Sequence, residues 1–146
     1  MKINGSYTLQ GVDLARAYTA LQDPQVLTVC IPGCESLEKT GDAEYAMKMK
    51  MALAAVSGQF TGKVKIVDPN PPSTFKMIVE GNGKIGFMKG EGLLNLTSAD
   101  ANVEVTYDGE VQVGGTMAAI GQRLIDTTSK MMIKRFFDKL SEQLAT

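Results

Sequence analysis

The hydrophobic period of this chain changes once, at Gly114-Gly115, and this change strongly constrains the fold. Before the two glycines, apolar and polar residues alternate with a period of two, as they do in half-buried strands. After them, apolar residues recur about every 3.6 positions, as on one face of a helix. A helix from Met117 to Leu144 would be about 42 Å long at about 1.5 Å per residue, and it could cross a whole sheet.

The alternation predicts a first strand over Lys2–Gln10 and about six more antiparallel strands between Glu35 and Val113. It is clearest in Glu44–Ala55, where tyrosine and methionines occupy one face and lysines the other. Ala99–Asn102 is expected to close a hairpin.

Two short helices are predicted to follow the first strand. Asp13 can cap one helix and Asp23-Pro24 can begin the other, which Pro32-Gly33 ends. Further along, the proline-rich stretch 68–72 must be an exposed connection, because proline has no N–H to donate to a sheet. Gly81-Asn82-Gly83 is expected to give a turn or a kink.

These elements together predict an α+β fold of the helix-grip type. A sheet of about seven strands and a long apolar helix can bury both apolar faces only if the sheet curls around the helix. The length of 146 residues fits one domain, over residues 1–146, with one core.

Charge and hydropathy exclude several function classes. The 15 basic and 16 acidic residues give a formal net charge of −1, which provides no field to attract nucleic acid. No apolar run reaches the roughly 18 residues of a membrane-spanning helix. The opening MKINGSY lacks the apolar stretch of a signal peptide, so we expect a cytoplasmic protein.

The chain has no histidine and only two cysteines, Cys30 and Cys34. A zinc site is therefore improbable, and we expect reduced, structural thiols. A catalytic triad and a histidine general base are excluded. The acidic residues are expected on solvated strand faces, so we predict a binding protein without metal, required cofactor or catalytic residues; those that could act as a base only by turning inward are Glu44, Glu80, Glu91 and Glu104.

A sheet bent around a helix leaves a wedge between them, and its walls are expected to be rich in methionine. Thioether side chains are flexible and polarizable, so such walls suit a large apolar ligand. The residues expected to line this cavity are Met47, Met49, Met51, Phe60, Val64, Phe75, Met77, Phe87, Met88, Leu94, Tyr107, Met117, Ile120, Leu124 and Met131.

The alternative is that the methionines simply fill the core, and periodicity cannot separate the two interpretations. Small residues favour the cavity, since they would leave volume that a packed core fills. They are Ala46, Ala52, Gly62, Gly90 and Gly92.

The terminal helix ends in a mixture of basic and aromatic residues, from Lys130 to Lys139. This mixture is compatible with peripheral membrane contact, but a solvated basic face with Phe136 in the core is the stronger interpretation. Phe137 is then expected to lie off the buried stripe.

Several segments resemble the carbon monoxide dehydrogenase G-subunit (CoxG) family, and together they cover nearly the whole chain. They are Asp23-Pro24-x-x-Leu27-x-x-Cys30-Ile31-Pro32-Gly33-Cys34-Glu35-x-Leu37-Glu38, Gly41-Asp42-x-Glu44-Tyr45, Phe60-x-Gly62-Lys63-Val64, Gly86-Phe87-x-Lys89-Gly90, and Gln112-Val113-Gly114-Gly115 continuing to Gly121-x-Arg123-Leu124-Ile125.

The resemblance implies a START-like, Bet v 1-like domain, the same helix-grip fold. It also implies an accessory role beside a molybdenum hydroxylase of the aerobic carbon monoxide dehydrogenase type, either bringing the enzyme to the inner face of the membrane or carrying a lipophilic quinone. A quinone with an isoprenoid tail would suit a methionine-lined wedge, because each buried methylene contributes about 0.8 kcal/mol.

Three functions remain open from the sequence. The first is an apolar-ligand carrier for the hydroxylase, and the second is a recruitment factor that acts through its surface with a filled core. The third is a cyclase-like or dehydratase-like enzyme, which requires Tyr107 or Glu91 to line the wedge.

Overall fold

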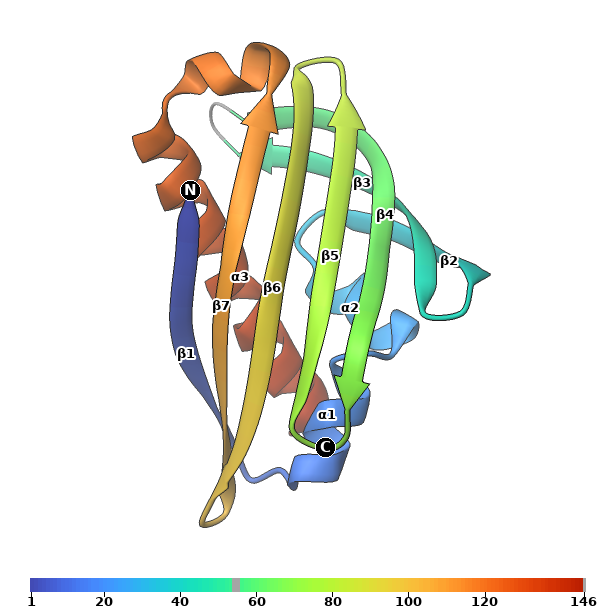
Figure 1. Ribbon diagram of the computed structural model, residues 1–146, viewed down its shortest axis with the longest axis vertical. Coiled ribbons are helices and arrows are strands. Elements are labelled where there is room, and N and C mark those ends of the chain that lie inside the picture. The colour runs from blue at the N-terminus through green and yellow to red at the C-terminus, as the bar shows by residue number, and fades with distance from the viewer. Residues whose placement is uncertain (54–55, 146) are drawn as a thin grey trace.

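A computed structural model describes residues 1–53 and 56–145 of the chain (Figure 1). The end of the strand expected to reach Ala55, the side chain of Ala52 and the terminal Thr146 lie outside the described parts. In chain order the elements are β1 (Lys2–Gln10), α1 (Leu14–Ala20), α2 (Pro24–Cys30), β2 (Cys34–Gly41), β3 (Glu44–Leu53), β4 (Val56–Asn70), β5 (Thr74–Gly83), β6 (Gly86–Ala99), β7 (Asn102–Gly114), the 3-10 helix η1 (Gly115–Ile120) and α3 (Gln122–Leu144).

The predicted fold class is confirmed. The seven strands form one antiparallel sheet in the order β1-β7-β6-β5-β4-β3-β2. The sheet curves, and α3 runs along its concave side, while α1 and α2 lie near the C-terminal end of α3 (Figure 1). This is the helix-grip arrangement.

The two short helices begin where the capping residues predicted. The Asp13 carboxylate accepts a hydrogen bond from the Arg16 backbone N–H at 2.8 Å, and the Asp23 carboxylate accepts one from Gln25 N–H at 2.9 Å. Such caps satisfy N–H groups that the first helical turn leaves without partners. Pro24 occupies the first turn of α2, where it loses no hydrogen bond.

The turn expected at Gly81-Asn82-Gly83 is wrong, because β5 continues through all three residues. Gly83 pairs with Gly86, so Lys84 and Ile85 form the turn instead. A Cβ on Gly83 would lie 2.7 Å from the Gln59 carbonyl oxygen. Glycine is needed here for the close approach of β4 and β5 rather than for a change of direction.

The terminal helix is shorter than the continuous Met117–Leu144 helix that periodicity predicts. Residues 115–120 form η1, and α3 begins only after Gly121, whose φ of 102° is in the region that favours glycine. The 23 residues of α3 span about 35 Å. The break places Met117 and Ile120 on a separate segment, which the backbone N–H of Met117 ties to the Ile85 carbonyl.

Two clusters of side chains fill the space between the sheet and α3. We call the first the aromatic cluster, and its buried and half-buried rings are Tyr7, Tyr18, Phe75, Tyr107, Phe136 and Phe137. We call the second the methionine cluster, and its buried residues are Met47, Met49, Met51, Phe60, Val64, Met117 and Ile125.

The expected position of Phe137 is wrong. Its side chain is only 3% exposed, and its ring stacks on Tyr7 and Tyr107 with centroid distances of 5.2 and 5.9 Å. Phe136 is half-buried and meets Phe137 edge to face. Because α3 lies in a concave sheet, both neighbouring rings find apolar partners, which a single buried stripe does not anticipate.

Candidate functional site

A small cavity of about 40 Å³ lies inside the methionine cluster. Strands β3 to β7, η1 and α3 contribute its walls. The lining residues are Met47, Met49, Met51, Phe60, Gly81, Met88, Val113, Met117, Ile125, Thr128, Ser129 and Met132.

The alternation in β3 builds the largest part of this wall. Met47, Met49 and Met51 point inward and are 2%, 5% and 8% exposed, whereas Lys48 and Lys50 are exposed on the convex face. Successive side chains of a strand point to opposite faces, so three thioethers gather on the helix side. The period-two prediction for these residues therefore agrees with their placement.

The small residues that were expected to leave volume act differently. A Cβ on Gly62 would collide with the Glu80 carbonyl, so this glycine allows β4 and β5 to approach closely. Gly90 and Gly92 are on β6 and do not line the cavity. Empty volume at these positions is thus not what shapes the methionine wall.

The cavity holds little more than one water molecule, whose share of liquid volume is about 30 Å³. Pockets for drug-sized ligands are commonly about 300 to 1,000 Å³. The thioether groups themselves therefore fill most of the space, as the alternative interpretation of the sequence expects. A larger guest can enter only if these flexible side chains move.

The predicted lining residues fall into four groups. Met47, Met49, Met51, Phe60, Met88 and Met117 do line the cavity. Val64, Met77 and Ile120 pack in or against the methionine cluster without lining it. Phe75, Leu94 and Tyr107 belong to the aromatic end of the core instead, and Met131 is half-buried outside the cavity.

Phe87 and Leu124 do not point into the core and are 47% and 51% exposed. Phe87 alternates with the inward-facing Met88, and its ring covers Gly114, where a Cβ would collide with it. Leu124 precedes the buried Ile125 on α3, and a step of one residue turns a side chain by about 100°. Both departures follow from local geometry that overall hydrophobicity does not encode.

Six lining residues were missing from the expected set: Gly81, Val113, Ile125, Thr128, Ser129 and Met132. The helical stripe that begins at Met117 already contained Ile125, Thr128 and Met132, so periodicity could have found them. Ser129 gave no such signal. The hydroxyls of Thr128 and Ser129 are the polar side-chain groups of an otherwise apolar lining.

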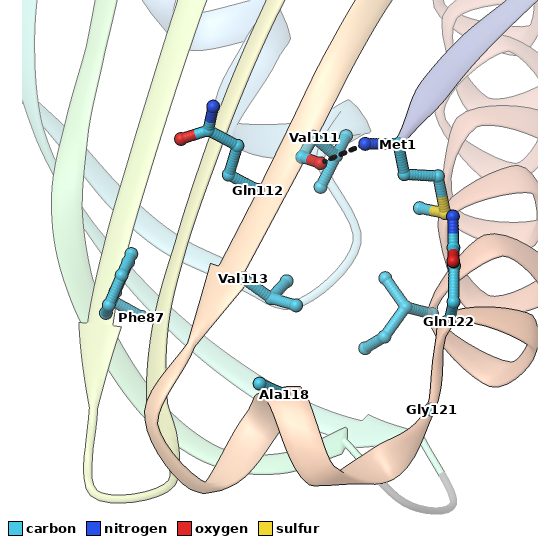
Figure 2. Close-up of a pocket in the computed structure, with 9 residues that line it drawn as sticks. Met1, Phe87, Val111, Gln112, Val113, Ala118, Gly121 and Gln122 are labelled. Atoms are coloured by element: carbon cyan, nitrogen blue, oxygen red, sulfur yellow. Dashed lines mark hydrogen bonds between the residues drawn. The ribbon is translucent and has the colours of Figure 1, made fainter.

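A second and larger space, an outer cleft of about 500 Å³, opens beside the cavity. Figure 2 shows Val113 of β7 and Gln122 of α3 on opposite sides of it. Its lining residues are Met1, Phe87, Val111, Gln112, Val113, Ala118, Gly121, Gln122 and Ile125. Val113 and Ile125 line both spaces, so these two side chains separate the outer cleft from the methionine cavity.

Polar chemistry is sparse around the cavity. Glu44 and Glu80 lie 3.8 Å from Lys63 and Lys89, and Glu91 and Glu104 are exposed. Neither Tyr107 nor Glu91, which an enzyme of the cyclase or dehydratase kind requires, is among the cavity-lining residues. Within the described ranges, no three acidic or cysteine side chains gather as a metal site needs.

The two cysteines are free thiols. Cys30 is 2% exposed in the core beside the aromatic cluster, and burial raises the pKa of its thiol to about 11. Cys34 packs against the methionine cluster, and burial also raises the pKa of its thiol. A thiol with a raised pKa is mostly protonated at neutral pH and is a poor nucleophile.

A family model for CoxG, the G-subunit of carbon monoxide dehydrogenase, matches residues 11–145. A conserved protein from Geobacillus kaustophilus is 36% identical, with a TM-score of 0.95 over 99% of this chain and 95% of that chain. No curated protein sequence matches the chain significantly.

More distant solved structures share the fold. Protein CV1439 from Chromobacterium violaceum is 12% identical, with a TM-score of 0.76 over 99% of this chain and 97% of that chain. Ara h 8.0201 is 14% identical, with a TM-score of 0.71 over the same shares of the two chains. None of the helices in the described part of the chain has the length and hydrophobicity to span a bilayer.

Proposed function

The chain belongs to the carbon monoxide dehydrogenase G-subunit (CoxG) family, and from this premise we propose that it is a non-enzymatic accessory protein that binds a lipophilic quinone or a similar molecule for a molybdenum hydroxylase. The hydroxylase would be of the aerobic carbon monoxide dehydrogenase type, and the protein would serve it on the cytoplasmic side of the membrane. The methionine wall supports this proposal more than any other feature.

The wall suits an oily guest because of its chemistry. Six of its side chains are thioethers, Met47, Met49, Met51, Met88, Met117 and Met132. Methionine has three rotatable side-chain bonds and a polarizable sulfur, so such a wall can re-form around ligands of different shape. Each methylene of an isoprenoid tail that leaves water contributes about 0.8 kcal/mol.

Binding requires the wall to open, because the cavity holds only about 40 Å³. Part of the binding free energy must then be spent on moving thioethers out of contact with one another. We therefore expect moderate affinity that improves with tail length, up to the length the opened wedge can cover.

Native mass spectrometry and lipid extraction test the proposal. Protein purified from a quinone-producing host should carry an extractable lipophilic molecule. Met47→Leu combined with Met49→Leu keeps the volume but stiffens the wall, and should lower the bound fraction. Met131→Leu is the matched control outside the cavity. Folded wild-type protein that is empty in every quinone-containing preparation would contradict the proposal.

The closed cavity favours a second candidate, a recruitment factor that contacts the hydroxylase through its surface and carries no ligand. Met49→Phe distinguishes the two, because a larger ring in the cavity excludes a guest and leaves the outer surface unchanged. A pull-down of the hydroxylase that survives this substitution, with no ligand detected in the wild type, would favour recruitment.

Membrane contact through the end of α3 receives less support. Lys130, Lys134 and Lys139 pair with Asp126, Asp138 and Glu142 at 3.0, 2.8 and 3.5 Å. These pairs neutralise much of the basic face, and the burial of Phe137 removes an aromatic anchor from it.

A further inference from the structure

The outer cleft and the methionine cavity have a common wall. Val113 on β7 and Ile125 on the first turns of α3 line both spaces. Val113 is half-buried and Ile125 is 6% exposed. Displacing these two aliphatic side chains would join the outer cleft of about 500 Å³ to the space that the methionines occupy.

Polarity differs on the two sides of this wall. The cavity lining is apolar apart from the hydroxyls of Thr128 and Ser129. The lining of the outer cleft includes the amide side chains of Gln112 and Gln122, and Gln122 lies across the outer cleft from Val113 (Figure 2). An amide both donates and accepts hydrogen bonds, so it can bind a carbonyl or a hydroxyl group equally well.

The α3 side of the wall is attached less firmly than the rest of the helix. Ile125 follows Gly121, which separates η1 from α3, and no side chain caps the first turn. No atom lies within 4 Å of the position of a Cβ on Gly121. Ile125 packs on flexible thioethers, whereas Phe137 near the other end of α3 is held between two tyrosine rings.

We infer that the outer cleft is the entrance to the methionine cavity and the binding site for the polar end of an amphiphilic ligand. The apolar part of the ligand passes between Val113 and Ile125, and a carbonyl or hydroxyl at the other end hydrogen-bonds to Gln122. This inference rests on the proposed function, since it concerns how the same ligand is bound.

The nine methionines of the chain provide the probe. In protein carrying ¹³C-labelled methionine methyl groups, decylubiquinone should shift the signals of Met47, Met49, Met88 and the other cavity methionines. Met1 should shift as well, because it lines the outer cleft. Met131 lines neither space and should stay unchanged.

Gln122→Trp tests the entrance, because it places a large ring in the outer cleft from an exposed position that the core does not depend on. Arg123→Trp is the matched control, since Arg123 is exposed in the same turn and lines neither space. We expect Gln122→Trp to slow the uptake of decylubiquinone at least about tenfold and Arg123→Trp to leave uptake unchanged, because only the first obstructs the path.

Gln122→Leu tests the polar end, because it keeps the size of the side chain and removes the amide. We expect the Kd for decylubiquinone to rise by about five- to tenfold, which corresponds to the loss of one hydrogen bond. An unchanged Kd would overturn the assignment of the polar end to Gln122.

Two further outcomes are distinct. If the cavity methyl signals shift while Gln122→Trp and Arg123→Trp take up the quinone at the same rate, the entrance is elsewhere and the proposed function stands. If the wild type shows neither methyl shifts nor saturable binding, the proposed function itself fails.

Discussion

The two clusters beneath α3 bury similar amounts of apolar side chain in different ways. In the aromatic cluster, Phe137 stacks between Tyr7 and Tyr107, and Tyr18 meets Phe75 edge to face at a centroid distance of 5.6 Å. In the methionine cluster, thioethers surround a cavity of about 40 Å³. Rigid rings allow few alternative packings, whereas thioethers allow many.

Hydrogen bonds add to the contrast. The Tyr7 hydroxyl donates to the Asp138 carboxylate at 2.8 Å, and the Lys134 ammonium donates to its other oxygen at 2.8 Å. These bonds join β1 to α3 at the aromatic end. One helix is thus fastened at its C-terminal half and lies on a deformable surface at its N-terminal half, which allows one end to open while the other keeps the fold.

The largest expected effect comes from truncating one residue in each cluster. Phe137→Ala should lower the free energy of unfolding by about 3 to 5 kcal/mol, because the two tyrosine rings cannot close the gap. Met49→Ala should cost only about 2 kcal/mol, since neighbouring thioethers can collapse into the space. Urea denaturation measures both losses. Equal losses would mean that the two clusters are equally rigid.

The cysteines report on the two ends separately, and this effect comes next in size. Cys30 belongs to the core around the aromatic cluster and Cys34 packs against the methionine cluster. We expect iodoacetamide to modify Cys34 about tenfold faster than Cys30, a difference of about 1.4 kcal/mol in opening and ionisation. Peptide mass spectrometry of native protein follows both thiols. Faster modification of Cys30 would reverse the assignment of the looser end.

A smaller effect is expected from Tyr7→Phe, which removes the hydroxyl but keeps the stacked ring. We expect Tm to fall by about 2 to 4 °C. The pKa of Asp138 should also rise, because hydrogen bonds from Lys134 and Tyr7 hold it below its ordinary value of 3.8. Carboxyl NMR titration measures this pKa. Tyr18→Phe, whose hydroxyl donates to the Thr74 carbonyl, should leave it unchanged.

The smallest effect is a dependence of stability on pH. Because the pKa of Asp138 is lowered in the folded protein, its ionised form stabilises the fold above the unfolded-state pKa. This contribution disappears as pH falls through the lower, folded-state pKa. Urea midpoints measured from about pH 5 down to about pH 2 should fall less steeply for Asp138→Asn than for the wild type. Parallel curves would mean that the bond contributes nothing to stability.

Much of the fold could be predicted because the sequence carries two clear periodicities. The alternation in Glu44–Leu53 and the caps at Asp13 and Asp23 have direct structural counterparts. The break at Gly121 could not be predicted, since the apolar stripe continues across it and only the backbone conformation interrupts the helix. The turn at Lys84-Ile85 was missed because the neighbouring glycines serve close strand approach.

The candidate site was less predictable than the fold. Periodicity assigns a side chain to a face, so it placed Met47, Met49 and Met51 correctly on the helix side. It does not say how far along the wedge a residue lies, and Phe75 and Tyr107 are therefore in the other cluster. It also cannot give a volume, because whether thioethers meet or leave a space depends on their rotamers and on the distance of α3 from the sheet.

The sheet order also has a consequence for synthesis of the chain. Lys2 of β1 pairs with Glu110 of β7, so the first strand made must wait for nearly the last one. At about 5 to 20 residues per second, a ribosome needs about 5 to 20 s to make the intervening segment. During this interval the edge of β1 has no partner, and it is exposed to whatever binds nascent strands. Closing such a long loop is slow, so docking of β1 is expected to be among the last steps of folding.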